Sequence, residues 1–86
     1  MALYKIFITP LCGYCAKAEQ ILKQNGVQYE VFERTDENTE YLHNLAPELK
    51  YGALTTYPQV FVGKKRIGGS DDLEQYAEDC LGGLGG

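Results

Sequence analysis

The 86-residue sequence is poor in basic residues, in long apolar runs and in cysteine. Its 8 lysines and arginines are outnumbered by 12 aspartates and glutamates, which gives a formal net charge of −4. Nucleic-acid-binding modules usually carry a basic excess, so we expect no nucleic-acid partner. No apolar run approaches the ~20 residues that cross a bilayer, and the segment Leu3–Ile8 is too short for a signal-peptide core. We therefore expect a cytoplasmic protein with no membrane partner.

The length and composition favour one small globular domain. Chains divide at roughly 100–200 residues per domain. Hydrophobic residues make up 44% of the chain and charged residues 23%, a globular rather than a disordered composition. We expect the domain to cover residues 1–81, with residues 82–86 (Gly-Gly-Leu-Gly-Gly) as a flexible tail, and we expect a monomer.

The three cysteines are too few, and odd in number, for a secreted disulfide framework. In a reducing compartment the close pair Cys12 and Cys15 must then be redox-active or metal-binding. A structural zinc site needs four ligands, and only Cys80 and His43 remain as candidates. Cys80 falls on an apolar helix face, where we expect it to be buried. His43 lies in a polar stretch, where we expect it to be solvated, so we expect no metal ion at the pair.

The residue pattern predicts an α/β chain in the order β-α-β-α-β-β-α. Because the first strand, helix and strand fall within about thirty residues, they form a βαβ unit with parallel strands and a right-handed crossover. The predicted strands are Leu3–Ile8, Val27–Glu33, Gln59–Val62 and Lys65–Ile67, and the predicted helices run from Cys15 to Asn25, from the polar cap Thr35–Asn38 to Pro47, and from Ser70 to Leu81.

The segment Cys12-Gly13-Tyr14-Cys15 lies between a predicted strand and the helix that follows it. A C-x-x-C beside a βαβ pattern is typical of a thioredoxin-like redox site. Residues three apart in a helix have Cβ atoms about 5–6 Å apart, whereas a disulfide needs roughly 3.8 Å. A small adjustment in the first helical turn closes that gap, so the bond can form and open without unfolding the chain.

The two sulfurs of this segment are predicted to be unequal. Cys12 lies at the helix N-terminus, where unpaired N–H groups and the helix dipole stabilise a thiolate. Cysteines in such sites have a pKa of about 3.5–7.5 instead of ~8.5. Cys15 lies one turn further on, on the apolar face, and should keep its proton longer. The sequence therefore predicts Cys12 as the nucleophile and Cys15 as the resolving thiol.

Three segments in this order make the chain resemble a glutaredoxin over essentially its whole length: residues 12–18, 55–62 and 67–73. The resemblance implies a thioredoxin fold, with a four-stranded mixed sheet flanked by three helices. It also implies a glutathione-dependent thiol–disulfide oxidoreductase that reduces protein disulfides and glutathione mixed disulfides, with glutathione as co-substrate. Its protein partners would be disulfide-containing or glutathionylated proteins, and ribonucleotide reductase is a candidate client.

The resemblance further implies a glutathione site. The proline at Pro58 would be cis and face the active-site sulfurs, which leaves the backbone N–H and C=O of Tyr57 open to a cysteinyl peptide. A helix N-terminus after Gly69 would hold the γ-glutamyl carboxylate. An aspartate would hold the amino group, and Asp71 and Asp72 are both open for this role. The expected glutathione-binding residues are Tyr14, Thr56, Tyr57, Pro58, Gly69, Ser70, Asp71 and Asp72.

The sequence departs from the family pattern at three places. Gly13 replaces the commoner proline between the cysteines, and Tyr57 replaces a smaller residue before the cis-proline. The basic residue often found shortly before the first cysteine is missing, since Thr9, Pro10 and Leu11 stand there. Charge for the glycyl carboxylate would then come from elsewhere, although each candidate reads more simply as a solvated side chain: Lys50, Lys64, Lys65 and Arg66.

Two alternative functions stay open. Some glutaredoxins that lack proline between their cysteines hold a [2Fe–2S] cluster across a dimer, and Cys12 of each chain would then be a ligand together with two glutathiones. The other alternative is a thioredoxin-type reductant that a flavoenzyme reduces. The dithiol pair favours the glutathione-dependent oxidoreductase over both.

Overall fold

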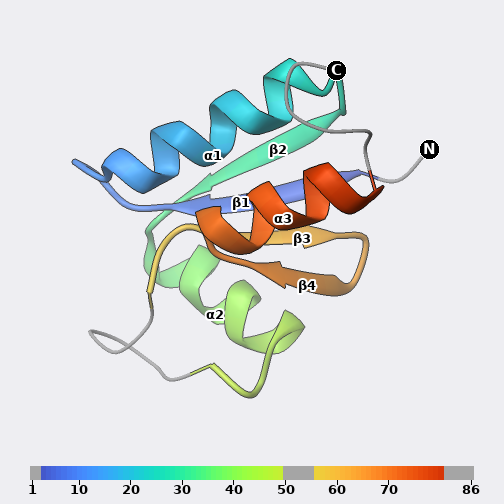
Figure 1. The fold of residues 1–86 in the computed structure, drawn as a ribbon. Coiled ribbons are helices and arrows are strands. Elements are labelled where there is room, and N and C mark those ends of the chain that lie inside the picture. Colours follow the sequence, from blue (N-terminus) through green and yellow to red (C-terminus); the bar gives the residue numbers. More distant parts are fainter. Residues whose placement is uncertain (1–2, 50–55, 81–86) are drawn as a thin grey trace.

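The chain alternates strands and helices in the predicted order β-α-β-α-β-β-α (Figure 1). The computed structural model describes residues 3–49 and 56–80, so the expected tail at 82–86 and the end of the 1–81 domain lie outside the described residues. The elements are β1 (Tyr4–Ile8), α1 (Gly13–Gln24), β2 (Tyr29–Glu33), α2 (Asp36–Leu45), β3 (Gln59–Val62), β4 (Lys65–Gly68) and α3 (Ser70–Cys80).

The four strands form one mixed sheet in the order β2-β1-β3-β4. β1 and β2 are parallel, with Ile6 opposite Val31, because α1 carries the chain back along the sheet between them. β3 is antiparallel to β1 and pairs with β4 across a tight turn, where Gly63 has a φ of 60°. The predicted four-stranded mixed sheet flanked by three helices is confirmed.

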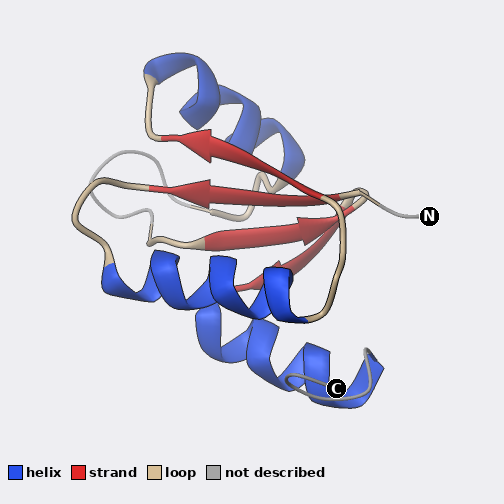
Figure 2. Cartoon of the chain, turned by 90° about the horizontal axis from the view of Figure 1, so that it is seen from above, coloured by secondary structure: helices blue, strands red, loops and turns tan. Residues whose placement is uncertain are grey.

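Strand β1 divides the core in two, because successive side chains of a strand point to opposite faces of the sheet. On one face, Tyr4 and Ile6 pack against apolar side chains of α1 and α3. On the other face, Phe7 packs against Leu42 of α2 and stacks on Phe32 at 4.9 Å between ring centroids. Figure 2 shows these helices on the two sides of the sheet. Full burial of such a side chain contributes about 1.5–3 kcal/mol, so both layers are held firmly to the sheet.

The parallel pairing of β1 and β2 determines where chemistry can occur. Both strands end at the same edge of the sheet, with Ile8 paired to Glu33. The segment after β1 leads to Cys12, and the segment after β2 begins with Arg34. Two parts of the chain that are far apart in sequence therefore meet at one edge.

Two residues differ from the expected burial. His43 is 2% exposed rather than solvated, because the face of α2 that carries Leu42 lies against the sheet and includes it. Cys80 is exposed rather than buried, because α3 ends there, beyond its last buried residue Ala77. Within residues 3–49 and 56–80, no group of three or more His, Cys, Asp and Glu side chains could hold a metal ion. In the same residues, no helix combines the length and apolar character needed to cross a membrane.

Candidate active site

Cys12 is the N-cap of α1, as the sequence predicts. Its backbone is extended, with φ −109° and ψ 106°, and its Sγ accepts a hydrogen bond of 3.2 Å from the amide of Cys15. Ser, Thr, Asp and Asn usually fill this position and accept the same bond through oxygen. Here a sulfur takes the place of that oxygen, so an N–H donor and the positive end of the helix dipole would stabilise negative charge on Cys12.

The two cysteines form a disulfide but differ in exposure. Their Cα atoms are 5.2 Å apart, within the usual range of about 4.4–6.8 Å. Cys12 is partly exposed, whereas Cys15 is 3% exposed and faces the core with Ala18 and Leu22. An incoming disulfide can therefore reach Cys12, and Cys15 can reach only the sulfur of Cys12. The geometry agrees with a nucleophilic Cys12 and a resolving Cys15.

The peptide bond between Tyr57 and Pro58 is cis, as the family resemblance implies. Pro58 is buried, and the carbonyl oxygen of Tyr57 lies 3.9 Å from Sγ of Cys12. The backbone of Tyr57 therefore lies directly beside the reactive sulfur.

Gln59 holds this segment in position, a role that the sequence did not reveal. Its side chain is 1% exposed. Its amide nitrogen donates to the backbone carbonyl of Thr56 at 3.0 Å and to the Thr56 hydroxyl at 3.1 Å. Its amide oxygen accepts a hydrogen bond of 3.0 Å from Nε of Arg66 on β4. Because buried polar groups need partners, this network fixes the loop before Pro58 to the edge strand.

The residues expected to bind glutathione all line one hollow of about 200 Å³. It lies between the start of α1, the cis-proline segment and the start of α3. The structure therefore brings together every residue of the expected set: Tyr14, Thr56, Tyr57, Pro58, Gly69, Ser70, Asp71 and Asp72.

The two aspartates of this hollow have different surroundings. Asp72 accepts a hydrogen bond of 3.1 Å from the amide of Gly69 and so caps α3. Asp71 is exposed and makes no hydrogen bond or ion pair with any residue in the ranges 3–49 and 56–80. Gly68, with φ 125°, allows Asp72 to approach the backbone, since a Cβ there would lie 2.8 Å from Cγ of Asp72.

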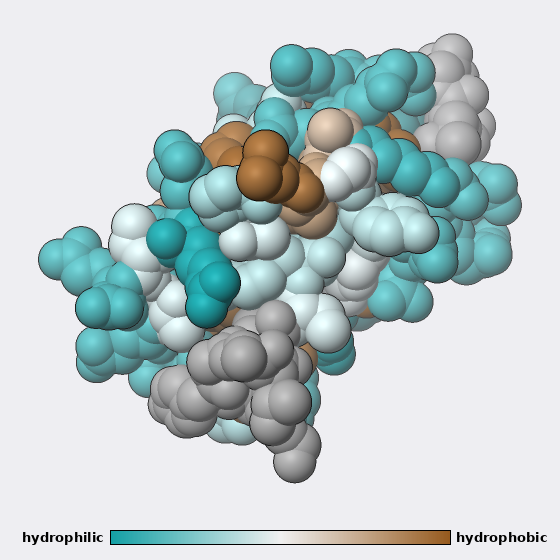
Figure 3. Space-filling model, turned by 90° about the vertical axis from the view of Figure 1, so that its left-hand side faces the viewer, coloured by the Kyte–Doolittle hydropathy of each residue, from teal (hydrophilic) through white to brown (hydrophobic). Residues whose placement is uncertain are grey.

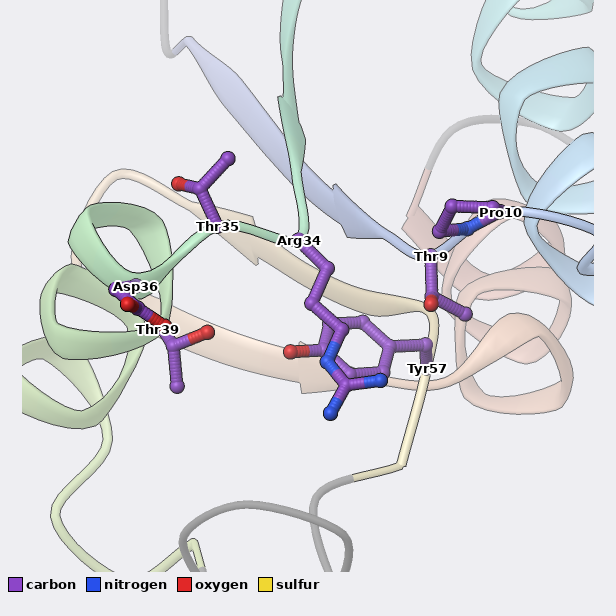
Figure 4. Close-up of a pocket in the computed structure, with 7 residues that line it drawn as sticks. All are labelled: Thr9, Pro10, Arg34, Thr35, Asp36, Thr39 and Tyr57. Carbon is purple, nitrogen blue, oxygen red and sulfur yellow. The ribbon is translucent and has the colours of Figure 1, made fainter.

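A second, larger hollow of about 470 Å³ adjoins the first, and Tyr57 lines both. Its other lining residues follow β1 or begin α2: Thr9, Pro10, Arg34, Thr35, Asp36 and Thr39. In Figure 4 the side chain of Arg34 enters this space from the end of β2, and the ring of Tyr57 enters it from the segment before β3. Of the cationic side chains in the described residues, only Arg34 lines either hollow.

The sequence candidates for this positive charge lie elsewhere. Lys64, Lys65 and Arg66 belong to the β3–β4 hairpin and line neither hollow. Lys65 lies over the ring of Tyr76 at 5.9 Å, and Arg66 is bound to Gln59. Lys50 lies outside the described residues. The signal that could have revealed Arg34 is its position directly after β2, the parallel neighbour of the strand that leads to Cys12.

A parallel–antiparallel sheet covered by helices on both faces, with a C-x-x-C at the start of the first helix beside a cis-proline, defines a dithiol protein of the thioredoxin fold. The comparisons with known proteins narrow this class. The glutaredoxin family model matches residues 4–67. Because it matches most of the chain, the chain belongs to the glutaredoxin family, whose members are glutathione-dependent thiol–disulfide oxidoreductases.

Individual relatives and a solved structure agree with this family membership. Glutaredoxin 3 of Escherichia coli is 36% identical over 84 residues, which cover 98% of this chain and 94% of that protein. Hybrid peroxiredoxin hyPrx5 of Haemophilus influenzae is 42% identical over 71 residues, which cover 83% of this chain but only 27% of that protein. The crystal structure of the buckwheat glutaredoxin–glutathione complex has a TM-score of 0.68 at 26% identity, over 91% of this chain and 70% of that one.

Proposed function

We propose that this chain reduces protein disulfides and glutathione mixed disulfides through Cys12, with the cytoplasmic glutathione pool as its source of electrons. The observation that carries the proposal is the position of the Cys12 sulfur. It caps α1, receives the amide N–H of Cys15 at 3.2 Å, and lies 3.9 Å from the carbonyl of Tyr57, which lines both hollows. A thiolate at this point is stabilised and accessible.

The reaction with a protein disulfide proceeds in two exchanges. The Cys12 thiolate attacks one client sulfur, a new S–S bond forms, and the other client sulfur leaves as a thiolate that takes a proton from water. The Cys15 thiolate then attacks the Cys12 sulfur and releases the second client thiol. The chain is left with the Cys12–Cys15 disulfide seen in the structure. Two glutathiones return it to the dithiol and become glutathione disulfide.

The smaller hollow suits the γ-glutamyl end of glutathione. The first-turn amides of Ser70 and Asp71 have no carbonyl partner within α3, and such groups at a helix start favour a carboxylate. Asp72 is engaged with Gly69 at 3.1 Å, so we assign the ammonium group to Asp71, whose carboxylate has no partner among the described residues. The exposed ring of Tyr14 lies beside this space.

The remaining groups of glutathione extend along Tyr57. Its cysteinyl backbone would pair with the open N–H and C=O of Tyr57 as a short added strand, which brings the thiol to Cys12. The glycyl carboxylate then passes into the larger hollow, where Arg34 supplies a positive charge. This arrangement assigns to Arg34 the role of the basic residue that the sequence lacks before Cys12.

Turnover of a glutathionylated substrate by wild type, Cys12→Ser and Cys15→Ser tests the assignment. With glutathione, glutathione reductase and NADPH supplied, Cys12→Ser should be inactive. Cys15→Ser should retain deglutathionylation, because glutathione itself can resolve that intermediate, but should lose reduction of an intramolecular protein disulfide. Substantial activity of Cys12→Ser would contradict the role assignment.

The same assay separates this proposal from a thioredoxin-type reductant. If thioredoxin reductase reduces the Cys12–Cys15 disulfide efficiently and glutathione does not, the thioredoxin-type function replaces the one proposed.

We propose a monomer as the working form and ribonucleotide reductase as one client to test. Sedimentation of the reduced protein and turnover of oxidised ribonucleotide reductase check these two points.

A [2Fe–2S] carrier function makes a different prediction. Iron–sulfur clusters are held mainly by cysteine thiolates, and Cys12 is the accessible thiol at this site. A Cβ at Gly13 would meet nothing within 4 Å, so the turn between the cysteines is uncrowded. Two copies of Cys12 and two glutathiones would complete such a site. A brown, dimeric protein after anaerobic purification would favour this function, and a colourless monomer would favour the dithiol enzyme.

A further inference from the structure

Leu11 has a backbone conformation that its side chain disfavours. Its φ is 58°, and it is the one non-glycine residue in the ranges 3–49 and 56–80 with a positive φ. Residues with a Cβ are uncommon in this left-handed region, and those found there are mostly Asn and Asp, whose short polar side chains bond locally. A branched apolar side chain gains nothing from this conformation.

The side chain of Leu11 is also fully exposed. It belongs to neither core cluster and lines neither hollow. Figure 3 views the end of the molecule at which α1 begins, and a small group of hydrophobic atoms lies at the centre of a mostly hydrophilic face. Neither folding nor the glutathione site described above accounts for a leucine here.

The position of Leu11 in the chain indicates which kind of molecule can contact its exposed side chain. It is joined by one peptide bond to Cys12, and any disulfide that Cys12 attacks must bring a sulfur to bonding distance of Cys12 Sγ. Because Leu11 is the chain neighbour of Cys12 and its side chain is fully exposed, a polypeptide that carries this disulfide can contact it. Glutathione, placed in the hollows of Tyr14, Tyr57 and Arg34, does not need to touch it.

We propose that Leu11 is a specificity residue for protein substrates, and that it contacts an apolar side chain next to the reacting cysteine of the client polypeptide. This inference rests on the proposed function and adds the class of client. One leucine, even together with the exposed ring of Tyr14, is a small part of the roughly 1,200–2,000 Å² that a stable interface buries. The contact therefore suits a client that binds briefly, not a second copy of this chain.

The contact acts during the exchange itself. The Cys12 thiolate attacks the glutathione sulfur of a glutathionylated client, so that a Cys12–glutathione bond forms and the client sulfur leaves as a thiolate, which takes a proton from water. Until the disulfide between the client and glutathione breaks, contacts of the client's side chains keep the client chain beside Cys12. An apolar neighbour of the client cysteine covers Leu11 and loses contact with water.

Two variants distinguish the effect of the Leu11 side chain from the effect of its left-handed backbone conformation. Leu11→Asn keeps a residue that tolerates the left-handed conformation but removes the apolar surface. Leu11→Met keeps an apolar side chain of similar size at the same position, although methionine is unbranched. The substrates are two glutathionylated peptides that differ only in the residue after the cysteine, leucine or serine, and the mixed disulfide of glutathione and cysteine as the small control.

Wild type and Leu11→Met should prefer the leucine peptide in kcat/KM by about fivefold, the effect of burying part of one apolar side chain. Leu11→Asn should lose the preference while its unfolding temperature stays equal or rises and its turnover of the small mixed disulfide stays within about twofold. If Leu11→Asn prefers the leucine peptide as strongly as wild type does, the inference is overturned. It is also overturned if wild type shows no preference between the two peptides. Failure of wild type on the small control contradicts the proposed function instead. A dimer of wild type that Leu11→Asn dissolves would assign Leu11 to self-association and overturn the inference.

Discussion

Oδ2 of Asp72 lies 3.1 Å from the backbone nitrogen of Gly69 and accepts its hydrogen bond. Gly69 is the residue before α3, and Asp72 is the third residue of that helix. This is one half of a capping box, in which the side chain at the third position reaches back to the N-cap amide. The other half is missing because glycine has no side chain. The amides of Ser70 and Asp71 therefore receive no cap from this pair and can donate to the glutathione carboxylate proposed above.

Asp71→Ala and Asp72→Ala should therefore affect different properties. Loss of the cap in Asp72→Ala should lower the free energy of unfolding by about 0.5–2 kcal/mol. Asp71→Ala should change it by less than about 0.5 kcal/mol, as is usual at exposed positions. The KM for glutathione should rise clearly in Asp71→Ala if its carboxylate binds the ammonium group. Urea titration and steady-state kinetics measure both, and equal effects of the two variants on stability would contradict the capping role.

Gly68→Ala should destabilise the protein, because its φ of 125° excludes a side chain and its Cβ would lie 2.8 Å from Cγ of Asp72. We expect a loss of about 1–3 kcal/mol in the free energy of unfolding. Gly13→Ala is the matched control, since a Cβ there meets nothing within 4 Å and Gly13 opens α1. The control should be neutral or more stable by up to about 1 kcal/mol. Similar urea midpoints for both variants would contradict this.

The sequence predicts most of the fold because the fold depends on local periodicity. The alternating residues of Leu3–Ile8 and the apolar spacing from Leu73 to Ala77 determine which faces are buried, and these predictions are confirmed. The burial of His43 and the exposure of Cys80 could not be predicted in this way. They depend on how far each helix face extends over the sheet, which is a tertiary property.

The site was predictable to the extent that it consists of short motifs. The C-x-x-C pair, the cis-proline and the start of α3 are each contiguous in sequence, and the structure brings them together. Arg34 and Gln59 lie in no such motif. The position of Arg34 follows from the parallel register of β1 with β2, and that of Gln59 from its hydrogen bond with Arg66 on β4. Pairing of distant segments is the information that the linear pattern lacks.

Burial, together with a hydrogen bond to Tyr76, raises the pKa of Tyr4 to about 12. The ordinary value is 10.0, so the folded state favours the neutral hydroxyl. The resulting stabilisation is fully present below about pH 10 and is lost as the pH rises through about 12. Thermal unfolding across this window should show a steeper loss for wild type than for Tyr4→Phe, which has no hydroxyl to ionise. If the unfolding temperatures of the two proteins fall equally with pH, the Tyr4 hydroxyl is not the cause of the loss.

Arg34→Gln should raise the KM for glutathione by about two- to fivefold, because an exposed ion pair contributes roughly 0.5–1 kcal/mol. The effect should shrink at high salt, where such a pair is screened. Lys64→Gln is the matched control, since Lys64 is also exposed but lines neither hollow. If both variants raise the KM equally, only the net charge matters, and Arg34 has no specific place in the site.

The most direct test of the account is the rate at which iodoacetamide alkylates each thiol of the reduced protein at about pH 6. Cys80 is a built-in reference, because it is exposed but lies at the end of a helix rather than at the start of one. Mass spectrometry of the digested protein should show Cys12 modified about tenfold faster than Cys80, with buried Cys15 slowest. If Cys12 reacts no faster than Cys80, the start of α1 does not activate its sulfur, and the proposed mechanism is wrong.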